Sequence, residues 1–287
     1  MTVTTTRALA LRHDFAVRTD DADLAAWLDE VVAPLAAPGT AAVTYQLDRG
    51  ADDRWTLRCD DEVVCAEAHP AHAVAMLLWH VNQRAVASAD DLVLLHAAGV
   101  ARGAIGLVLP GAPEAGKTTL AAGLVRAGWD YLSDEVVAID PASGAVRPYP
   151  KALSIDVGSQ TVLADLAPAL PRALRGRLPA QWQLPPDAIR PGAVARDRVV
   201  PRLLVFPRYV AGAATALTPL SRADALVAAT ASTFRYGDAG PRDLEVLAEV
   251  VRRSACYRLE VGDLTAACEA LSALVDEDAP AFQEAVP

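Results

Sequence analysis

The chain has 287 residues, of which 53% are hydrophobic and 22% charged, and this composition excludes an intrinsically disordered protein. Its formal net charge of −10 argues against a protein that mainly wraps nucleic acid, because phosphate binding needs an excess of Lys and Arg. Four cysteines without a CxxC pair are too few for a disulfide scaffold and indicate no structural zinc. We find no signal-peptide core and no membrane span, so we expect a soluble cytoplasmic protein that binds neither nucleic acid nor membrane.

Residues 1–90 are expected to form a small α+β domain. Alternating apolar residues over 7–18 predict one or two strands, and Asp20 and Asp21 stand where the cap of a periodic helix would lie. Three short strands separated by turn residues are expected next: 41–48, 54–59 and 62–66. A helix over 70–87, opened by a proline, ends this domain.

The pattern then changes to continuous apolar strands, which are typical of strands buried on both faces of a sheet. Strands are expected at 92–100, 105–109, 134–140, 145–149, 202–206 and 256–261. Helices are expected at 117–127, 221–231, 241–252 and 263–275. Residues 166–198 are rich in Pro and Arg and are interpreted as a long irregular excursion, and 278–287 as a flexible tail. The sequence therefore predicts an α/β domain over 91–277.

Positive charge is concentrated in one segment of this acidic protein. Residues 145–210 carry ten basic and four acidic side chains. This segment is either a surface that meets phosphates or an acidic partner, or a solvated region that has collected arginine. Lys117 and Lys151 are the only lysines among 26 basic residues, so lysine is retained at two positions in a chain that otherwise uses arginine.

The segment 111–118 reads GAPEAGKT and fits the Walker A pattern G-x-x-x-x-G-K-[ST] between an expected strand and an expected helix. Glycines let the turn wrap its N–H groups around an anion, and the helix adds its positive N-terminal end. Lys117 would reach the β- and γ-phosphates, and Thr118 would hold Mg²⁺. The alternative is a turn without a ligand. The expected nucleotide-binding residues are Gly111, Ala112, Pro113, Glu114, Ala115, Gly116, Lys117, Thr118 and Thr119.

Further polar residues surround this motif in the sequence. Asp134 and Glu135 stand at the head of an apolar strand, where carboxylates hold Mg²⁺ or accept the proton of an attacking hydroxyl. A solvated acidic turn is the alternative. His96 would orient this acidic pair or titrate together with it. The alternative is a core histidine whose hydrogen bonds are all made within the protein. Glu114 places a carboxylate where such loops often have glycine. It either points to solvent, or it lowers phosphate affinity by repulsion or changes the metal requirement.

Four segments carry a resemblance to a known family: 95–99 (LHAAG), 111–118, 120–128 (LAAGLVRAG) and 131–135 (YLSDE). Together they resemble the HPr serine kinase/phosphorylase family, and more closely the HPr-kinase-related proteins of peptide-modifying clusters. The resemblance covers roughly 91–156 and implies a P-loop HPr-kinase-like catalytic domain after the small N-terminal domain. It further implies catalytic roles for His96 and Lys117, Asp134 as general base, and Glu135 with Thr118 as metal ligands.

The departures from that family are also informative. Glu114 replaces a glycine, Glu135 a second aspartate and Thr118 a serine, and the family's downstream signature is not found. Reverse phosphate removal and HPr itself as substrate are therefore not expected. Lys151 and Arg208 are candidate substrate or phosphate contacts, although a surface lysine and a generic cation are the alternatives.

The resemblance implies an ATP- and Mg²⁺-dependent kinase that transfers the γ-phosphate to a hydroxyl, namely a serine of a peptide or small protein. A homo-oligomer is expected, because the family commonly assembles. Two alternatives remain open. One is a non-catalytic nucleotide-binding partner that recruits a peptide, and the other is a small-molecule kinase.

Overall fold

The computed structural model describes residues 3–4, 7–50, 54–67, 69–171, 174, 181–234 and 240–283. The chain divides into two compact units, which are considered separately. The first combines Met1–Asp90 with Lys151–Pro185, and the second combines Asp91–Pro150 with Pro186–Pro287. The expected boundary after residue 90 coincides with one division. The expected continuous domain over 91–277 does not, because 151–185 group with the first unit.

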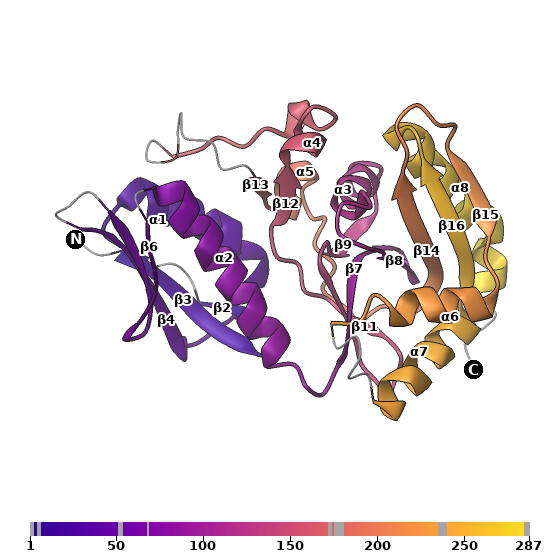
Figure 1. The fold of residues 1–287 in the computed structure, drawn as a ribbon, viewed down its shortest axis with the longest axis horizontal. Coiled ribbons are helices and arrows are strands. Elements are labelled where there is room, and N and C mark those ends of the chain that lie inside the picture. Colours follow the sequence, from indigo (N-terminus) through magenta and orange to yellow (C-terminus); the bar gives the residue numbers. More distant parts are fainter. Residues whose placement is uncertain are drawn as a thin grey trace. The chain divides into compact units, whose positions relative to one another are not determined.

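Within its described residues, the first unit contains a six-stranded sheet of order β1-β3-β4-β5-β6, with β2 paired to β3. Its strands are β1 (Val3–Thr4), β2 (Ala8–Ala10), β3 (His13–Thr19), β4 (Val43–Arg49), β5 (Trp55–Cys59) and β6 (Glu62–Glu67). Strands β3 and β4 are parallel, and α1 (Ala22–Val32) with the 3₁₀ turn η1 (Ala33–Leu35) connects them. Helix α2 (Pro70–Ala87) packs on β5 and β6 (Figure 1).

The local signals in this unit are confirmed. Asp21 caps α1, because its side chain accepts a hydrogen bond from the backbone N–H of Leu24. One face of α1, which includes Leu24 and Leu28, is fully buried. Helix α2 begins at Pro70 and ends at Ala87, as its sequence predicts.

The irregular excursion expected over 166–198 is wrong where it contains regular elements. Strand β13 (Gln181–Leu184) pairs antiparallel with β12 (Leu153–Asp156), and α5 (Pro186–Ile189) of the second unit follows. Short helical turns lie between the two strands: α4 (Val157–Gln160) and η2 (Ala164–Leu166). The pairing of β12 with β13 joins residues far apart in sequence, so periodicity alone gave no signal for it. Residues 172–173 and 175–180 lie outside the described part of the chain.

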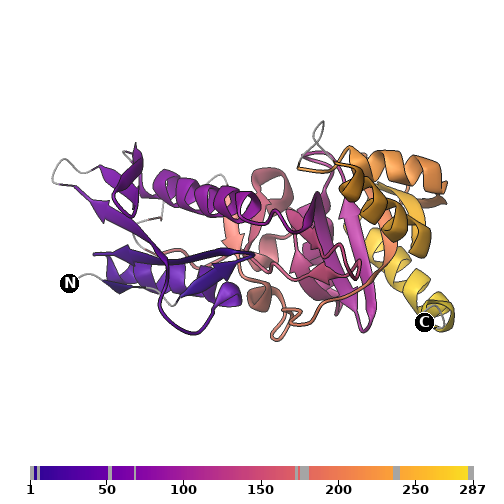
Figure 2. The same cartoon turned by 90° about the horizontal axis from the view of Figure 1, so that it is seen from below.

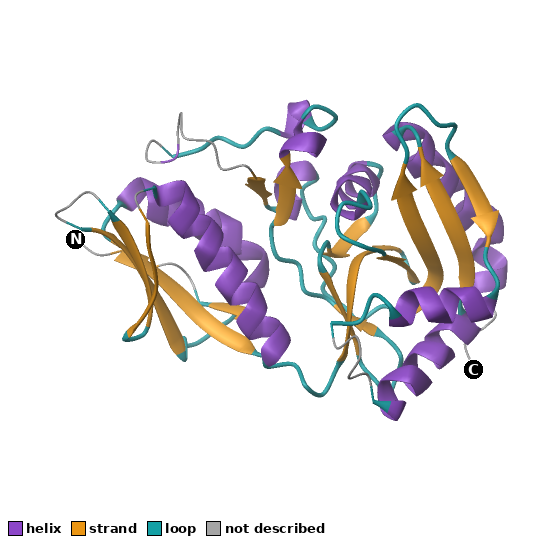
Figure 3. Cartoon of the chain, in the orientation of Figure 1, coloured by secondary structure: helices purple, strands orange, loops and turns teal. Residues whose placement is uncertain are grey.

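In the described part of the second unit, an eight-stranded sheet has the order β11-β10-β7-β8-β14-β16-β15, with β9 on β7 (Figure 3). Its strands are β7 (Val93–Arg102), β8 (Ile105–Pro110), β9 (Asp130–Ser133), β10 (Val136–Ile139), β11 (Val146–Arg147), β14 (Pro201–Tyr209), β15 (Ala216–Pro219) and β16 (Ala255–Val261). Strand β14 runs parallel to both β8 and β16, whereas the other pairs are antiparallel. The expectation of a mixed α/β protein is confirmed.

Four further helices accompany this sheet: α3 (Lys117–Arg126), α6 (Arg222–Thr230), α7 (Pro241–Arg253) and α8 (Leu264–Gln283). Helix α3 packs on α8, and α6 packs on α7. Helix α8, yellow in Figures 1 and 2, extends to Gln283, so the tail expected from residue 278 is wrong up to that point. Residues 284–287 lie outside the described part. No helix among the described residues is long and apolar enough to cross a membrane.

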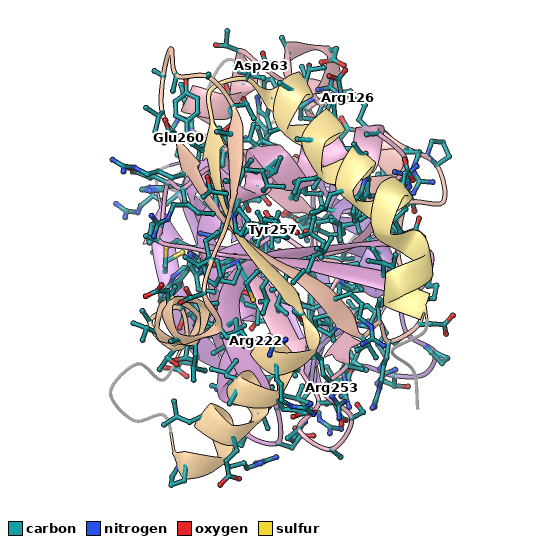
Figure 4. The ribbon with its side chains drawn as sticks, turned by 90° about the vertical axis from the view of Figure 1, so that its right-hand side faces the viewer. Arg126, Arg222, Arg253, Tyr257, Glu260 and Asp263 are labelled. Atoms are coloured by element: carbon teal, nitrogen blue, oxygen red, sulfur yellow. The ribbon has the colours of Figure 1, made fainter. Side chains whose placement is uncertain are left out.

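The two faces of this sheet are distinguished by their side chains. Val93, Leu95 and Ala97 of β7 belong to a buried apolar cluster that includes residues of α6 and α7. Because side chains alternate along a strand, His96 lies on the opposite face. Figure 4 shows α8 beside β16, on which Tyr257 is labelled. Helix α3 packs against α8, and its first residue contacts His96, so both helices belong to the His96 face.

Candidate functional site

The glycine-rich loop 111–118 connects β8 to α3, as expected. Gly116 precedes α3 with a φ of +88°, a left-handed conformation that suits glycine. A Cβ atom added to Gly111 would lie 3.3 Å from the Cβ atom of Ala115, so the loop is tightly wound. Glu114 also has a positive φ, +64°, which is unusual for a residue with a side chain. Its side chain is exposed, and an exposed carboxylate in the loop is compatible with either expectation for it.

Lys117 places its ammonium group over the start of this loop. Its Nζ donates to the carbonyl oxygens of Gly111 (2.9 Å) and Ala112 (2.7 Å), and lies 3.1 Å from Nε2 of His96. Burial lowers the pKa of Lys117 to about 8, although the carboxylates of Asp134 and Glu135 raise it. These three contacts of Nζ are with neutral groups and the two carboxylates act on it through their charge, so an anion at this position would gain a favourable interaction with the buried cation.

His96 is held in one orientation by its neighbours. Burial, and then the nearby charge of Lys117, lower its pKa, so the ring is neutral at pH 7. Since Lys117 Nζ is a donor, Nε2 of His96 accepts and the ring proton is assigned to Nδ1. The ring of Phe234 packs edge-on against it at 5.8 Å, and the His96 backbone N–H donates to Ser232.

The acidic pair lies between β9 and β10, beside this cluster. Asp134 is 3% exposed, and one carboxylate oxygen accepts a hydrogen bond of 2.9 Å from the hydroxyl of Tyr131. The backbone carbonyl of Glu135 accepts from Ala97, the residue after His96. Both carboxylates raise the pKa of His96 as they do that of Lys117. The structure therefore brings these acidic residues into electrostatic range of the lysine and the histidine.

Two candidate residues are not brought to this cluster. Arg208 is exposed on β14, and strand alternation places it on the same face as Leu204 and Phe206, which contact the α6–α7 side. It therefore faces away from His96. Lys151 belongs to the first unit, where its Nζ donates to the carbonyl of Ala152.

Part of the basic segment 145–210 has a structural role. Arg190 donates to the carbonyl oxygens of Val125 and Trp129 at the end of α3, and forms an ion pair of 2.6 Å with Asp130. Arg198 forms an ion pair of 2.8 Å with Asp140. Three other arginines of this segment lie outside the described residues: Arg172, Arg175 and Arg177. The charges of Arg190 and Arg198 are thus balanced within the second unit.

Sequence reasoning assigned no role to Tyr131 or Phe234. Tyr131 stands three residues before Asp134, so its place in an acidic motif was a usable signal. Phe234 lies far along the chain from His96, and its contact depends on the bridge between Leu95 and Thr233. Nothing in the sequence around it marks this contact.

The donor set suits a nucleotide-bound Mg²⁺ better than a metal held by protein alone. Among the described residues, no group of three or more His, Cys, Asp or Glu side chains is arranged to hold a metal. Mg²⁺ that arrives with phosphates needs only one or two protein oxygens. The Thr118 hydroxyl and the Glu135 carboxylate are oxygen donors on partly buried residues, so both fit this requirement.

Comparison with models of known protein families finds no match for this chain, and comparison with curated proteins finds none either.

Proposed function

We propose that the chain is an ATP-dependent kinase that transfers the γ-phosphate to the hydroxyl of a serine in a peptide or small protein. The observation that carries this proposal is the cluster of Lys117, His96 and Asp134 at the end of β8. The resemblance of roughly 91–156 to the HPr serine kinase/phosphorylase family supports an HPr-kinase-like catalytic domain in the second unit.

Phosphate binding uses the loop and the helix that follows it. The first N–H groups of α3 have no acceptor within the helix, and they lie at its positive end. Lys117 adds a buried cation beside them, held by Gly111 and His96. These donors suit the terminal phosphates of a nucleoside triphosphate.

Transfer requires an acceptor for the proton of the attacking hydroxyl. Asp134 has this role, and the Tyr131 hydroxyl fixes its orientation. The serine oxygen forms a bond to the γ-phosphorus, the bond from that phosphorus to the bridging oxygen breaks, and ADP leaves. Lys117 stabilises the negative charge that develops on the phosphate oxygens. Mg²⁺, held by Thr118 and Glu135, would supply further charge neutralisation when bound with ATP.

The experiment is intact-mass analysis of serine-containing peptides after incubation with the protein, ATP and Mg²⁺. Matched peptides with alanine in place of serine define the acceptor. A gain of about 80 Da per phosphate is expected. Asp134→Asn and Lys117→Ala should abolish it, whereas Arg252→Ala, a change on the exposed surface of α7, should not.

Measurements of ATP binding and of ADP release in the same mixtures separate the alternatives. Binding of ATP without release of ADP in the presence of any peptide would favour a non-catalytic nucleotide-binding protein. Release of ADP that depends on a small-molecule alcohol, with no mass gain on peptides, would instead indicate a small-molecule kinase.

A further inference from the structure

Tyr209 is an exposed aromatic residue at the end of β14. Its side chain is 58% exposed, whereas other aromatic residues of the second unit, such as Trp129 and Tyr149, are almost fully buried. Its hydroxyl makes no hydrogen bond to any residue that the structure describes. Tyrosine is enriched at binding surfaces, because its ring is apolar and its hydroxyl is polar.

Tyr209 lies directly beside the glycine-rich loop. Strand β14 is the parallel neighbour of β8, so the two strands end at the same edge of the sheet (Figure 1). A Cβ atom added to Gly116 would lie 3.7 Å from the Cβ atom of Tyr209. The side chain of Tyr209 therefore starts next to Gly116, the residue that precedes Lys117.

The strand pattern places Tyr209 on the same face of the sheet as His96. Leu204 and Phe206 of β14 face the α6–α7 cluster, so Tyr209 faces the opposite side, with α3 and His96. In the sheet order, however, β7 and β14 flank β8 on opposite sides. His96 and Tyr209 thus lie on one face but on either side of the loop.

This arrangement gives a bound nucleotide a direction. The γ-phosphate must lie near Lys117, His96 and Asp134, which are on the β7 side of the loop. The other end of an extended nucleotide then leaves the loop on the β14 side, at the carboxyl edge of parallel strands where ligands of α/β proteins bind. We propose that the ring of Tyr209 stacks on the nucleotide base. This inference rests on the nucleotide binding proposed above.

The backbone around Tyr209 is fixed, which suits a stacking surface. Tyr209 pairs with Val261 of β16, and the next backbone N–H, that of Val210, donates to Val261 at 3.0 Å. A ring on a fixed strand loses little conformational freedom when a base stacks on it. Because every base has an aromatic face, stacking on Tyr209 gives affinity without strong preference for adenine over guanine.

The test compares ligands with and without a base. Binding of ATP, GTP and inorganic tripolyphosphate, each with Mg²⁺ and without peptide, is measured by isothermal titration calorimetry. Tyr209→Ala should weaken ATP and GTP binding by roughly 5- to 100-fold and leave tripolyphosphate binding unchanged. Tyr209→Phe and Tyr209→Trp should retain ATP affinity. Leu244→Ala, which removes an exposed apolar side chain from α7, serves as the matched control.

The other outcomes overturn the inference in distinguishable ways. Equal loss of ATP and tripolyphosphate affinity in Tyr209→Ala would show that the residue supports the loop at Gly116 and not the base. Unchanged ATP affinity in Tyr209→Ala would exclude stacking while nucleotide binding stands. Failure of the unmodified protein to bind either ATP or tripolyphosphate would overturn the proposed function together with this inference.

Discussion

Each unit of the molecule buries a small polar cluster with a histidine and a tyrosine, and the two clusters differ in kind. In the first unit, the Tyr45 hydroxyl lies 3.0 Å from Nε2 of His13 and 2.9 Å from Nδ1 of His80. In the second, Lys117 contacts His96 while Tyr131 holds Asp134. Burial lowers the pKa of the histidines in both places.

The first cluster is formed by the neutral side chains of Tyr45 and His13, both buried, and of His80, which is partly buried. Tyr45 is fully buried, and its ring packs edge-on against Phe15 and His80 within regular strands and a helix. In the second cluster, Lys117 directly follows a loop whose backbone is left-handed at Glu114 and Gly116, and Asp134 lies between β9 and β10. A buried histidine with a lowered pKa is therefore not by itself a functional site. Buried charged groups next to an unusual backbone conformation mark a functional site more reliably.

The largest expected effect is a loss of stability of the first unit in acid. Burial, followed by the charges of Arg84 and His80, lowers the pKa of His13 to about 4, while Asp14 and Asp60 oppose this. The native state thus holds His13 neutral, and an unfolded chain binds a proton near pH 6.5. The contribution of neutral His13 to the unfolding free energy is fully present above pH 6.5. It declines by up to about 3 kcal/mol as the pH falls towards 4. Urea unfolding followed by circular dichroism across this range measures it.

His13→Gln removes the titrating group and should flatten this pH dependence. His72→Gln, a change of an exposed histidine on α2, is the matched control and should leave the dependence intact. If His13→Gln retained the full acid dependence, another group would be responsible for it.

Removal of one hydroxyl tests the first cluster next. Tyr45→Phe leaves a nitrogen of His13 and one of His80 without their hydrogen-bond partner, at a cost of about 1–3 kcal/mol of unfolding free energy. Urea unfolding measures this loss. ATP affinity should not change, because this cluster belongs to the first unit and the loop proposed to bind ATP belongs to the second. If Tyr45→Phe lost ATP affinity but not stability, the first cluster would have a role in ATP binding and not in stability.

The same substitution in the second unit should act on catalysis. Tyr131→Phe removes the donor to buried Asp134, so we expect kcat to fall about tenfold while the Kd for ATP stays constant. Stability should fall by about 1 kcal/mol. Steady-state kinetics with a phosphorylated peptide as product, together with calorimetric ATP binding, separate these effects. Unchanged kcat in a destabilised variant would assign Tyr131 a purely structural role.

The sequence predicted the parts of the site that are local. The strand, the loop and the start of α3 were correct because their signals lie within 105–126. The position of Arg208 was not predictable, since residue type does not reveal the face on which a strand residue lies. That face depends on the pairing of β14 with β8 and β16.

The division of the chain into units was also only partly predictable. The end of the first segment at Asp90 is marked by turn residues, whereas the grouping of 151–185 with it depends on tertiary contacts. Strand β10 also has four residues, but its apolar run was recognised, whereas β9 contains polar residues and β15 is mostly exposed, so both were missed. Short segments without clear alternation give no period to detect.

The smallest expected effect concerns Glu114, where backbone strain and charge coincide. Its φ of +64° costs a residue with a side chain about 1 kcal/mol relative to glycine, and its carboxylate stands in a loop proposed to bind phosphates. Glu114→Gly should therefore bind ATP several-fold more tightly, and Glu114→Gln, which removes only the charge, should recover most of that gain. The gain should shrink at high salt, because the exposed carboxylate is screened. Calorimetric Kd values at two salt concentrations test this. A gain in Glu114→Gly alone, independent of salt, would assign the effect to backbone strain and not to repulsion.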